Sequence, residues 1–119
     1  MATINYFTDL VVWKFSHSLV LEIYRLLQTF PNYEQFALSD QMRRSAVSIT
    51  SNIAEGFSRK GKKEKQQFYY LSKGSLTELQ NQLILSKDLK YLSVDTFSKL
   101  FESSMEIHKM FNGLIYSLK

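Results

Sequence analysis

The sequence predicts an all-α fold: one domain spanning residues 1–119, built as an antiparallel up-down-up-down four-helix bundle. The chain has one proline and four glycines, which are too few for the many tight turns of an all-β protein. Three segments break the helical periodicity: "FPNYEQFALS", "RKGKK" and "KYLSVD". They leave four stretches long enough for helices, and the short connections between them favour antiparallel neighbours.

The first two helices are delimited by proline and by capping residues. The first is expected from about residue 8 or 9 to residue 30, because Pro31 ends it. The second is expected to have Ser39 as its N-cap and Asp40 in its first turn, where a carboxylate suits the helix dipole. Gly56 and Gly61 are expected to let this helix end and its loop turn. The apolar stripe of the second helix is Met42, Ala46, Ile49, Ile53 and Phe57.

The third helix is expected to begin between Lys62 and Glu64. Its interior contains Gly74, which costs about 1 kcal/mol relative to alanine, so we expect another helix to approach closely there. Its predicted stripe is Phe68, Leu71, Ser75, Leu79, Leu83 and Leu89.

The fourth helix has the clearest pattern and is expected to be capped by Ser93, with Asp95 following. Its apolar face is wide, as is typical of a bundle helix. We interpret His108, which lies on this face, as a core histidine bonded to Ser104 or to a neighbouring helix. The alternative is a ligand or a base, but no second ligand is evident. The stripe consists of Val94, Phe97, Phe101, Ser104, His108, Phe111, Ile115 and Leu118.

Some apolar residues fall outside these stripes. The run from Leu83 to Leu85 points around most of the third helix, and Phe15, Tyr69, Tyr70 and Met110 also lie off the main faces. Such residues face either water or another subunit. We therefore expect a homo-oligomer.

Enzymatic motifs are incomplete in this chain. "GFSRKGKK" matches a phosphate-binding loop except that Lys63 replaces the final Ser or Thr, and a helical pattern precedes it instead of a strand. The same segment lacks the last glycine of a nucleophile elbow. A di-iron bundle needs Glu-x-x-His pairs, which neither histidine completes. We expect a protein that is not an enzyme and that binds no cofactor and no metal.

Two further expectations concern the cellular compartment. The N-terminus, "MATINYFTDLVVWK", lacks the pattern of a secretory signal, and no stretch has the roughly 18 consecutive apolar residues of a membrane span. We expect a cytoplasmic protein without a membrane partner.

Basic residues are concentrated in residues 43–65. The segment contains seven basic residues and two acidic residues, Glu55 and Glu64. It therefore carries the whole positive excess of a chain with net charge +4. One interpretation is a surface that binds RNA or DNA, with Tyr69 and Tyr70 available to stack on bases. The other is a solvated basic loop. The candidate nucleic-acid-binding residues are Arg43, Arg44, Arg59, Lys60, Lys62, Lys63 and Lys65.

A polar row borders the stripe of the second helix. Arg44, Ser48, Asn52 and Glu55 follow at steps of four, four and three. This row is expected to be either a hydrogen-bond network or a recognition surface. In a subunit contact, Arg43 or Arg44 would lie against Glu55 or Glu78 of a neighbour. The full candidate set is Gln41, Arg44, Ser48, Asn52, Glu55 and Glu78.

These residues resemble a known family over nearly the whole chain, residues 10–92 in particular. The resemblance is carried by Val12-Trp13 with Lys14, Phe30-Pro31, Gln41 with Arg43-Arg44, Val47-Ser48-Ile49, Asn52-Ile53-Ala54-Glu55-Gly56, and Gly74-Ser75-Leu76 with Glu78 and Leu83. The family is that of the bacterial four-helix-bundle proteins called ribosomal-RNA intervening-sequence proteins.

The resemblance implies a homopentameric barrel of small bundles with no known enzymatic activity. The expected fold is also similar to that of the accessory protein of diversity-generating retroelements, a basic pentameric bundle that engages nucleic acid and a reverse transcriptase. This likeness is an analogy of fold.

Two classes of function remain open. One is an oligomeric scaffold that binds nucleic acid. The other is a protein-interaction module that recruits or stabilises a partner enzyme, such as a reverse transcriptase, without touching nucleic acid itself.

Overall fold

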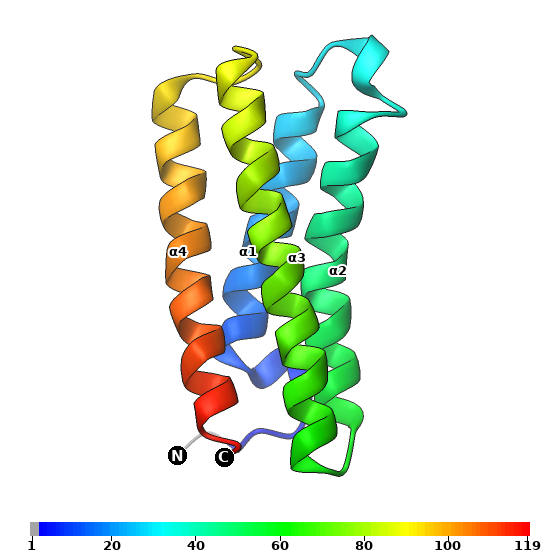
Figure 1. Cartoon of the computed structure of the whole chain (residues 1–119), viewed down its shortest axis with the longest axis vertical. Helices are drawn as coiled ribbons and strands as arrows, with labels where there is room; N and C mark the ends of the chain where they lie inside the picture. The colour runs from blue at the N-terminus through cyan, green and yellow to red at the C-terminus, as the bar shows by residue number, and fades with distance from the viewer. Residues whose placement is uncertain (1–2) are drawn as a thin grey trace.

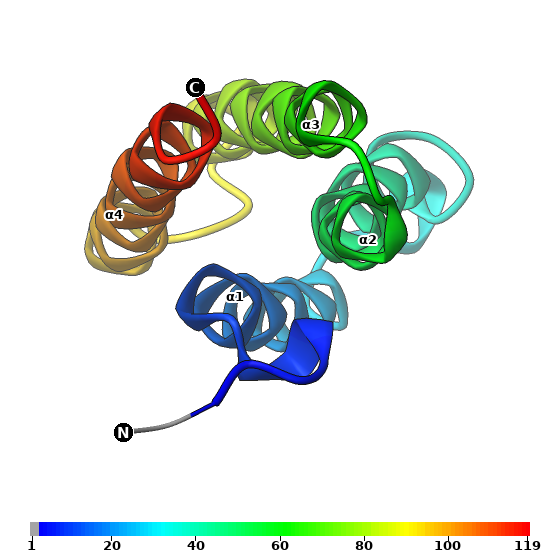
Figure 2. The ribbon, with the colours of Figure 1, turned by 90° about the horizontal axis from the view of Figure 1, so that it is seen from below.

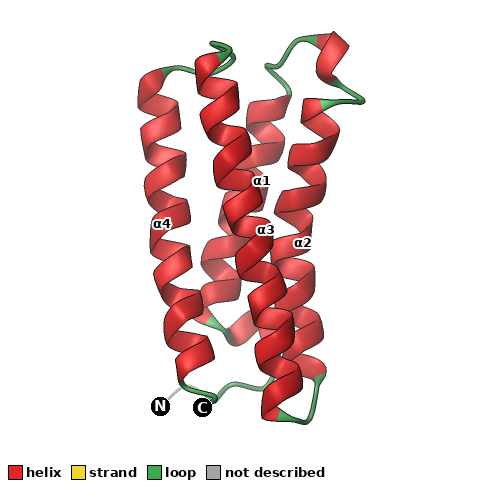
Figure 3. Ribbon diagram, in the orientation of Figure 1, coloured by secondary structure: helices red, strands yellow, loops and turns green. Residues whose placement is uncertain are grey.

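The computed structural model describes residues 3–119, and these residues contain four long helices and no strand (Figures 1 and 3). Short 3-10 turns at Phe7–Asp9 and Asn32–Glu34 precede the first two helices. The prediction of an all-α chain with four helices is confirmed. No helix in the described range is long and apolar enough to cross a bilayer. The helices are α1 (Val11–Leu27), α2 (Leu38–Ser58), α3 (Lys62–Asp88) and α4 (Val94–Tyr116).

The four helices lie in chain order around one core (Figure 2). α1 packs against α2 and α4, and α3 packs against the same two helices. The α1–α2 and α3–α4 connections lie at one end of the bundle (Figure 1). The α2–α3 turn lies at the other end, beside the C-terminal end of α4. The start of α3 and the end of α4 are neighbours in space, since Gln66 Nε2 donates to the Ile115 carbonyl at 3.2 Å.

α1 ends three residues earlier than predicted, at Leu27 instead of residue 30. The next three N–H groups, from Gln28 to Phe30, donate to carbonyls three residues back, which tightens the chain before Pro31. A residue before proline is disfavoured in the α conformation, so the helix cannot continue to Phe30. The Phe30 ring instead enters the core, with its centre 5.1 Å from that of Tyr91.

The prediction that Ser39 caps α2 is wrong. The N-cap is Ala37, and its side chain makes no capping bond. The Leu38 N–H donates to Glu34 Oε1 at 3.4 Å, so a carboxylate from the preceding turn serves the first helical residue. Ser39 lies inside the first turn and is buried.

Small side chains bring α2 and α3 together. Ser72 Oγ donates to the Ile49 carbonyl at 2.9 Å, and Ser75 Oγ donates to Ser48 Oγ at 2.8 Å. The prediction that Gly56 ends α2 is wrong, because α2 continues to Ser58 and Gly56 is buried against α3. The α2–α3 pair therefore approaches more closely than a leucine-lined seam would allow.

This close approach explains why part of the predicted stripe of α3 is wrong. Leu71 and Leu89 are half-exposed, whereas Tyr69, which lies off the predicted stripe, is only 2% exposed. Ser72, Gln82 and Ser86 occupy part of the buried face, so apolar spacing alone places that face incorrectly. The buried residues of α3 are Tyr69, Ser72, Leu76, Leu79, Gln82, Leu83 and Ser86.

The structure settles three further expectations about α3 and α4. Ser93 caps α4 as predicted, accepting a hydrogen bond from the Thr96 N–H at 3.1 Å. The close approach expected at Gly74 is absent from the described chain, since no atom lies within 4 Å of a β-carbon placed there. The core role of His108 is also wrong, because His108 is only partly buried. Ser104 Oγ instead donates to the Phe101 carbonyl and accepts from Gln80.

Candidate functional site

The seven basic residues of residues 43–65 do not form one surface. Arg43 and Arg44 lie near the start of α2, whereas the other five lie at or after its end. Arg44 and Arg59 are about 22 Å apart along the helix, at a rise of about 1.5 Å per residue. The two groups therefore occupy opposite ends of the bundle.

The arginine pair near the start of α2 is held by Asp40. Arg44 Nε lies 3.2 Å from Asp40 Oδ2, and Arg43 Nη2 lies 3.7 Å from Asp40 Oδ1. Arg43 Nη2 also donates to the Gln35 carbonyl at 2.9 Å. These contacts direct Arg43 back toward the α1–α2 connection.

Two of the basic residues at the other end support the α2–α3 turn. Lys65 Nζ donates to the Phe57 carbonyl at 2.7 Å and lies 3.5 Å from the Gly56 carbonyl. The Gly56 carbonyl also accepts from the Arg59 N–H, so the bond to the Phe57 carbonyl is the main contribution of this cation to the end of α2. Arg59 Nη2 pairs with Glu55 Oε2 at 3.3 Å, and its guanidinium carbon lies 4.8 Å from the Phe68 ring centre.

The remaining three lysines of the turn are free. Lys60, Lys62 and Lys63 are exposed, and no ion pair found among residues 3–119 includes any of them. Glu64 is the only acidic residue between Arg59 and Lys73. The turn therefore presents a local positive field to solvent.

Exposed aromatic and basic side chains continue from this turn along α3. Tyr70 follows Lys63 by seven residues, so both lie on one face of the helix, and Tyr70 is 52% exposed. Tyr70 lines a pocket of about 170 Å³ together with Lys73 and the end of α4, where Tyr116 is 74% exposed. Lys73 Nζ lies 5.9 Å from the Tyr70 ring centre.

These side chains make up what we call the lysine–tyrosine surface. It combines cations, which attract phosphates, with exposed rings, on which bases stack. No carboxylate side chain lines its pocket. The surface consists of Lys60, Lys62, Lys63, Tyr70, Lys73, Tyr116 and Lys119.

Part of this surface was not predicted from the sequence, and one ring was placed on it wrongly. Lys73, Tyr116 and Lys119 were not among the candidates, although the helical spacing from Lys63 to Tyr70 and on to Lys73 was a usable signal. Tyr69 cannot stack on a base, because it is buried beneath α2 and its burial raises the pKa of its phenol.

The residues of the polar row pair mostly within their own helix. Asn52 Nδ2 donates to the Ser48 carbonyl and hydroxyl, and the bond from Ser75 to Ser48 joins the row to α3. The two carboxylates of the set contact residues four positions later in the chain. Glu55 pairs with Arg59, and Glu78 Oε1 accepts from Gln82 Nε2 at 3.4 Å. The Gln41 carbonyl accepts from the Ser45 hydroxyl at 3.0 Å.

His108 is the histidine next to the lysine–tyrosine surface. Partial burial lowers its pKa from the ordinary value of 6.5, and the positive charge of Lys73 lowers it further. His108 is therefore neutral at neutral pH and becomes a cation only in acid. Among residues 3–119, no group of three or more His, Asp or Glu side chains is arranged to hold a metal ion.

Comparisons with known proteins agree with this fold. The family model described as 23S rRNA-intervening sequence protein matches residues 8–113. A search of curated proteins found no match.

One similar solved structure comes from Bacteroides thetaiotaomicron VPI-5482. It is described as a protein with unknown function from the S23 ribosomal protein family. It superposes with a TM-score of 0.83 at 23% sequence identity, covering 89% of this chain and 96% of that chain. At this identity the likeness establishes the shared helical fold.

Proposed function

The chain belongs to the family of 23S rRNA-intervening sequence proteins, as its motifs predicted, and on this premise we propose that it is a non-enzymatic, cytoplasmic scaffold that binds single-stranded nucleic acid. In this proposal, up-down-up-down bundles assemble as a homo-oligomer, a pentamer by family resemblance. Each copy contributes one lysine–tyrosine surface to the nucleic-acid contact.

The observation that supports nucleic-acid binding is the lysine–tyrosine surface. Its turn lysines, Lys60, Lys62 and Lys63, have no carboxylate partner, so a bound phosphate would not have to displace an existing ion pair. The rings of Tyr70 and Tyr116 line a pocket with Lys73 and Lys119, and such rings stack on bases of any identity. Unpaired bases are needed for stacking, which favours a single strand over a duplex.

The proposed homo-oligomer rests on apolar side chains that one chain leaves uncovered. Leu71 and Leu85 of α3 and its C-cap Leu89 are 53%, 45% and 46% exposed, and their spacing places them on one outward face of the helix. Gly74 lies on the same face with open space around it. An apolar stripe with a glycine in it suits the approach of a second helix.

A binding experiment with a charge-reversed turn tests the proposal. The variant carries Lys60→Glu, Lys62→Glu and Lys63→Glu, and its binding to a labelled single-stranded RNA is measured by fluorescence anisotropy. We expect affinity to fall by at least about tenfold, because three phosphate contacts become repulsive.

The matched control reverses three basic residues near the opposite end of the bundle, Arg25→Glu, Lys90→Glu and Lys99→Glu. It changes the net charge by the same amount. We expect it to weaken binding much less. Equal losses in the two variants would show that only the net charge matters and would contradict a defined surface.

The exposed stripe on α3 also supports the alternative function. A partner enzyme docking on Leu71, Leu85 and Leu89 would bury the same apolar area without any nucleic acid. Purification from a cell extract separates the two functions. The scaffold proposal expects co-purified nucleic acid that high salt or nuclease removes, whereas the alternative expects a protein partner that nuclease treatment leaves bound.

A further inference from the structure

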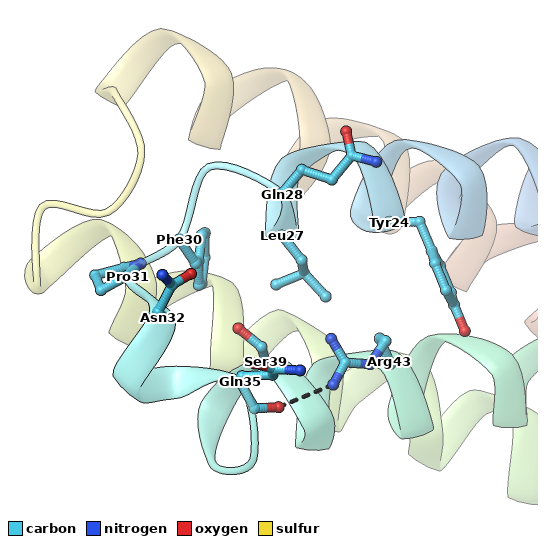
Figure 4. Close-up of a pocket in the computed structure, with 9 residues that line it drawn as sticks. All are labelled: Tyr24, Leu27, Gln28, Phe30, Pro31, Asn32, Gln35, Ser39 and Arg43. Carbon is cyan, nitrogen blue, oxygen red and sulfur yellow. Dashed lines mark hydrogen bonds between the residues drawn. The ribbon is translucent and has the colours of Figure 1, made fainter.

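A pocket lies between the end of α1 and the start of α2, at the end of the bundle opposite the lysine–tyrosine surface (Figure 4). Its volume is about 310 Å³, which is within the range of small-molecule sites. Leu27, Phe30 and Pro31 provide apolar walls, and Arg43 is the only charged residue among the described residues that line it. The lining is therefore mixed: an apolar patch lies beside polar side chains and a single positive charge.

Arg43 retains unused hydrogen-bond donors in this pocket. Both contacts recorded for its guanidinium, with the Gln35 carbonyl at 2.9 Å and with Asp40 Oδ1 at 3.7 Å, are made by Nη2. Its Nε–H and its two Nη1–H groups have no protein partner within residues 3–119. The Nη2 contacts fix the direction of the guanidinium, so an incoming oxyanion meets a pre-oriented donor group.

Ser39 provides a second, independent indication of a ligand. It is only 3% exposed and lines the pocket, yet its hydroxyl makes no hydrogen bond within the described chain. The hydroxyl is not one of the fully enclosed polar atoms without a partner, so it opens to the pocket, where water or a ligand can meet it. Ser39 also lies in the first turn of α2, where the helix dipole favours negative groups and where the Leu38 N–H already donates to Glu34 Oε1.

The nearby carboxylates already have partners in the protein. Asp40 pairs with Arg44 at 3.2 Å, and Glu34 accepts bonds from the Tyr91 hydroxyl and the Leu38 N–H. Neither lines the pocket. The electrostatic character of the lining is therefore set by Arg43.

We propose that this pocket binds a small organic oxyanion, a carboxylate or a phosphate monoester carried on a compact apolar body. The oxyanion accepts hydrogen bonds from Arg43 and Ser39, and the apolar body rests on Leu27 and Phe30. This inference is separate from the proposed nucleic-acid function, because the two sites lie at opposite ends of the bundle and use different residues.

Arg44, which is adjacent to Arg43 but does not line the pocket, provides the control for the binding test. Benzoate and phenyl phosphate are titrated into the ¹⁵N-labelled protein, with benzamide as the uncharged comparison, and binding is followed through the amide signals of Ser39 and Arg43. We expect both anions to shift these signals saturably and benzamide to shift them little. Arg43→Met should weaken binding by about tenfold or more, whereas Arg44→Met should leave it within about twofold. Ser39→Ala should also weaken binding.

Three outcomes would overturn the inference. One is the absence of saturable shifts in the wild-type protein. Another is an equal loss in the Arg43 and Arg44 variants, which would reveal only a general attraction to surface charge. The third concerns an added single-stranded oligonucleotide: shifts at Ser39 caused by the oligonucleotide but not by the small anions would assign the pocket to nucleic-acid phosphate instead of a small molecule.

Discussion

Gly56 of α2 lies directly against the ring of Tyr69 of α3. A β-carbon at Gly56 would come within 2.8 Å of Tyr69 Cε1 and within 2.9 Å of Phe68 Cβ. The contact stands one turn from the end of α2, just before the chain reverses into α3. The absence of a side chain at Gly56 therefore sets how closely the two helices meet and where the turn lysines are displayed.

We expect Gly56→Ala to destabilise the protein by about 1–3 kcal/mol, because the added methyl overpacks a seam with no room for it. Urea denaturation followed by circular dichroism measures the change. Gly113→Ala is the matched control, since nothing lies within 4 Å of a β-carbon at Gly113. That substitution should stabilise the chain by about 0.5–1 kcal/mol through helix propensity. Destabilisation by the control alone would contradict this account of the seam.

Lys65 is predicted to act mainly on stability, through its bond to the Phe57 carbonyl. We expect Lys65→Met to lower the free energy of unfolding by about 1 kcal/mol, because the end of α2 loses a charged cap. Lys62→Met, which removes a lysine without a recorded partner, should change stability by less than about 0.5 kcal/mol. Similar unfolding midpoints for the Lys65 and Lys62 variants would show that Lys65 does not stabilise the turn.

The general architecture was predictable from the sequence because glycine and proline are few and the helical periodicity is long, although several helix ends were misplaced. Ser93 caps α4 as its position predicts, and α3 begins at Lys62. The buried face of α3 was not predictable from apolar spacing, since Ser72 and Ser86 are fully buried there. Small polar residues at a close seam carry no hydrophobic signal.

The candidate site was predictable only in part. The turn lysines stood out as a charge cluster. The contribution of Tyr116 depends on α4 ending beside α3, and this arrangement is known only from the tertiary structure. Arg43 clustered with the lysines in sequence and lies far from them in space, because a long helix separates the two ends of the charged segment.

We expect Leu85→Glu to dissociate the proposed homo-oligomer, because a charge would be placed within the exposed stripe of α3. Light scattering at micromolar concentration measures the mass of the particle. Leu21→Glu, at a leucine of α1 that is 46% exposed, provides the control and should leave the assembly intact. A wild-type protein that is already monomeric would contradict the proposed assembly.

Protonation of His108 should oppose folding. Its pKa is lowered in the folded protein, first by burial and then by Lys73, so the folded state binds the proton less readily than the unfolded chain does. Stability is therefore full above the unfolded pKa of 6.5 and declines as the pH falls through that value. We expect His108→Gln to lose less stability than the wild type between about pH 7.5 and about pH 5.5. Identical pH profiles would contradict the lowered pKa.

The salt dependence of RNA binding tests the lysine–tyrosine surface most directly. Anisotropy titrations between about 50 and 300 mM salt give the slope of the logarithm of affinity against the logarithm of salt concentration. The account predicts that replacing Lys60, Lys62 and Lys63 by methionine reduces the magnitude of this slope by about 2, since each phosphate contact to a single strand contributes about 0.7. A wild-type protein without measurable affinity at low salt, or a triple variant with an unchanged slope, would contradict it.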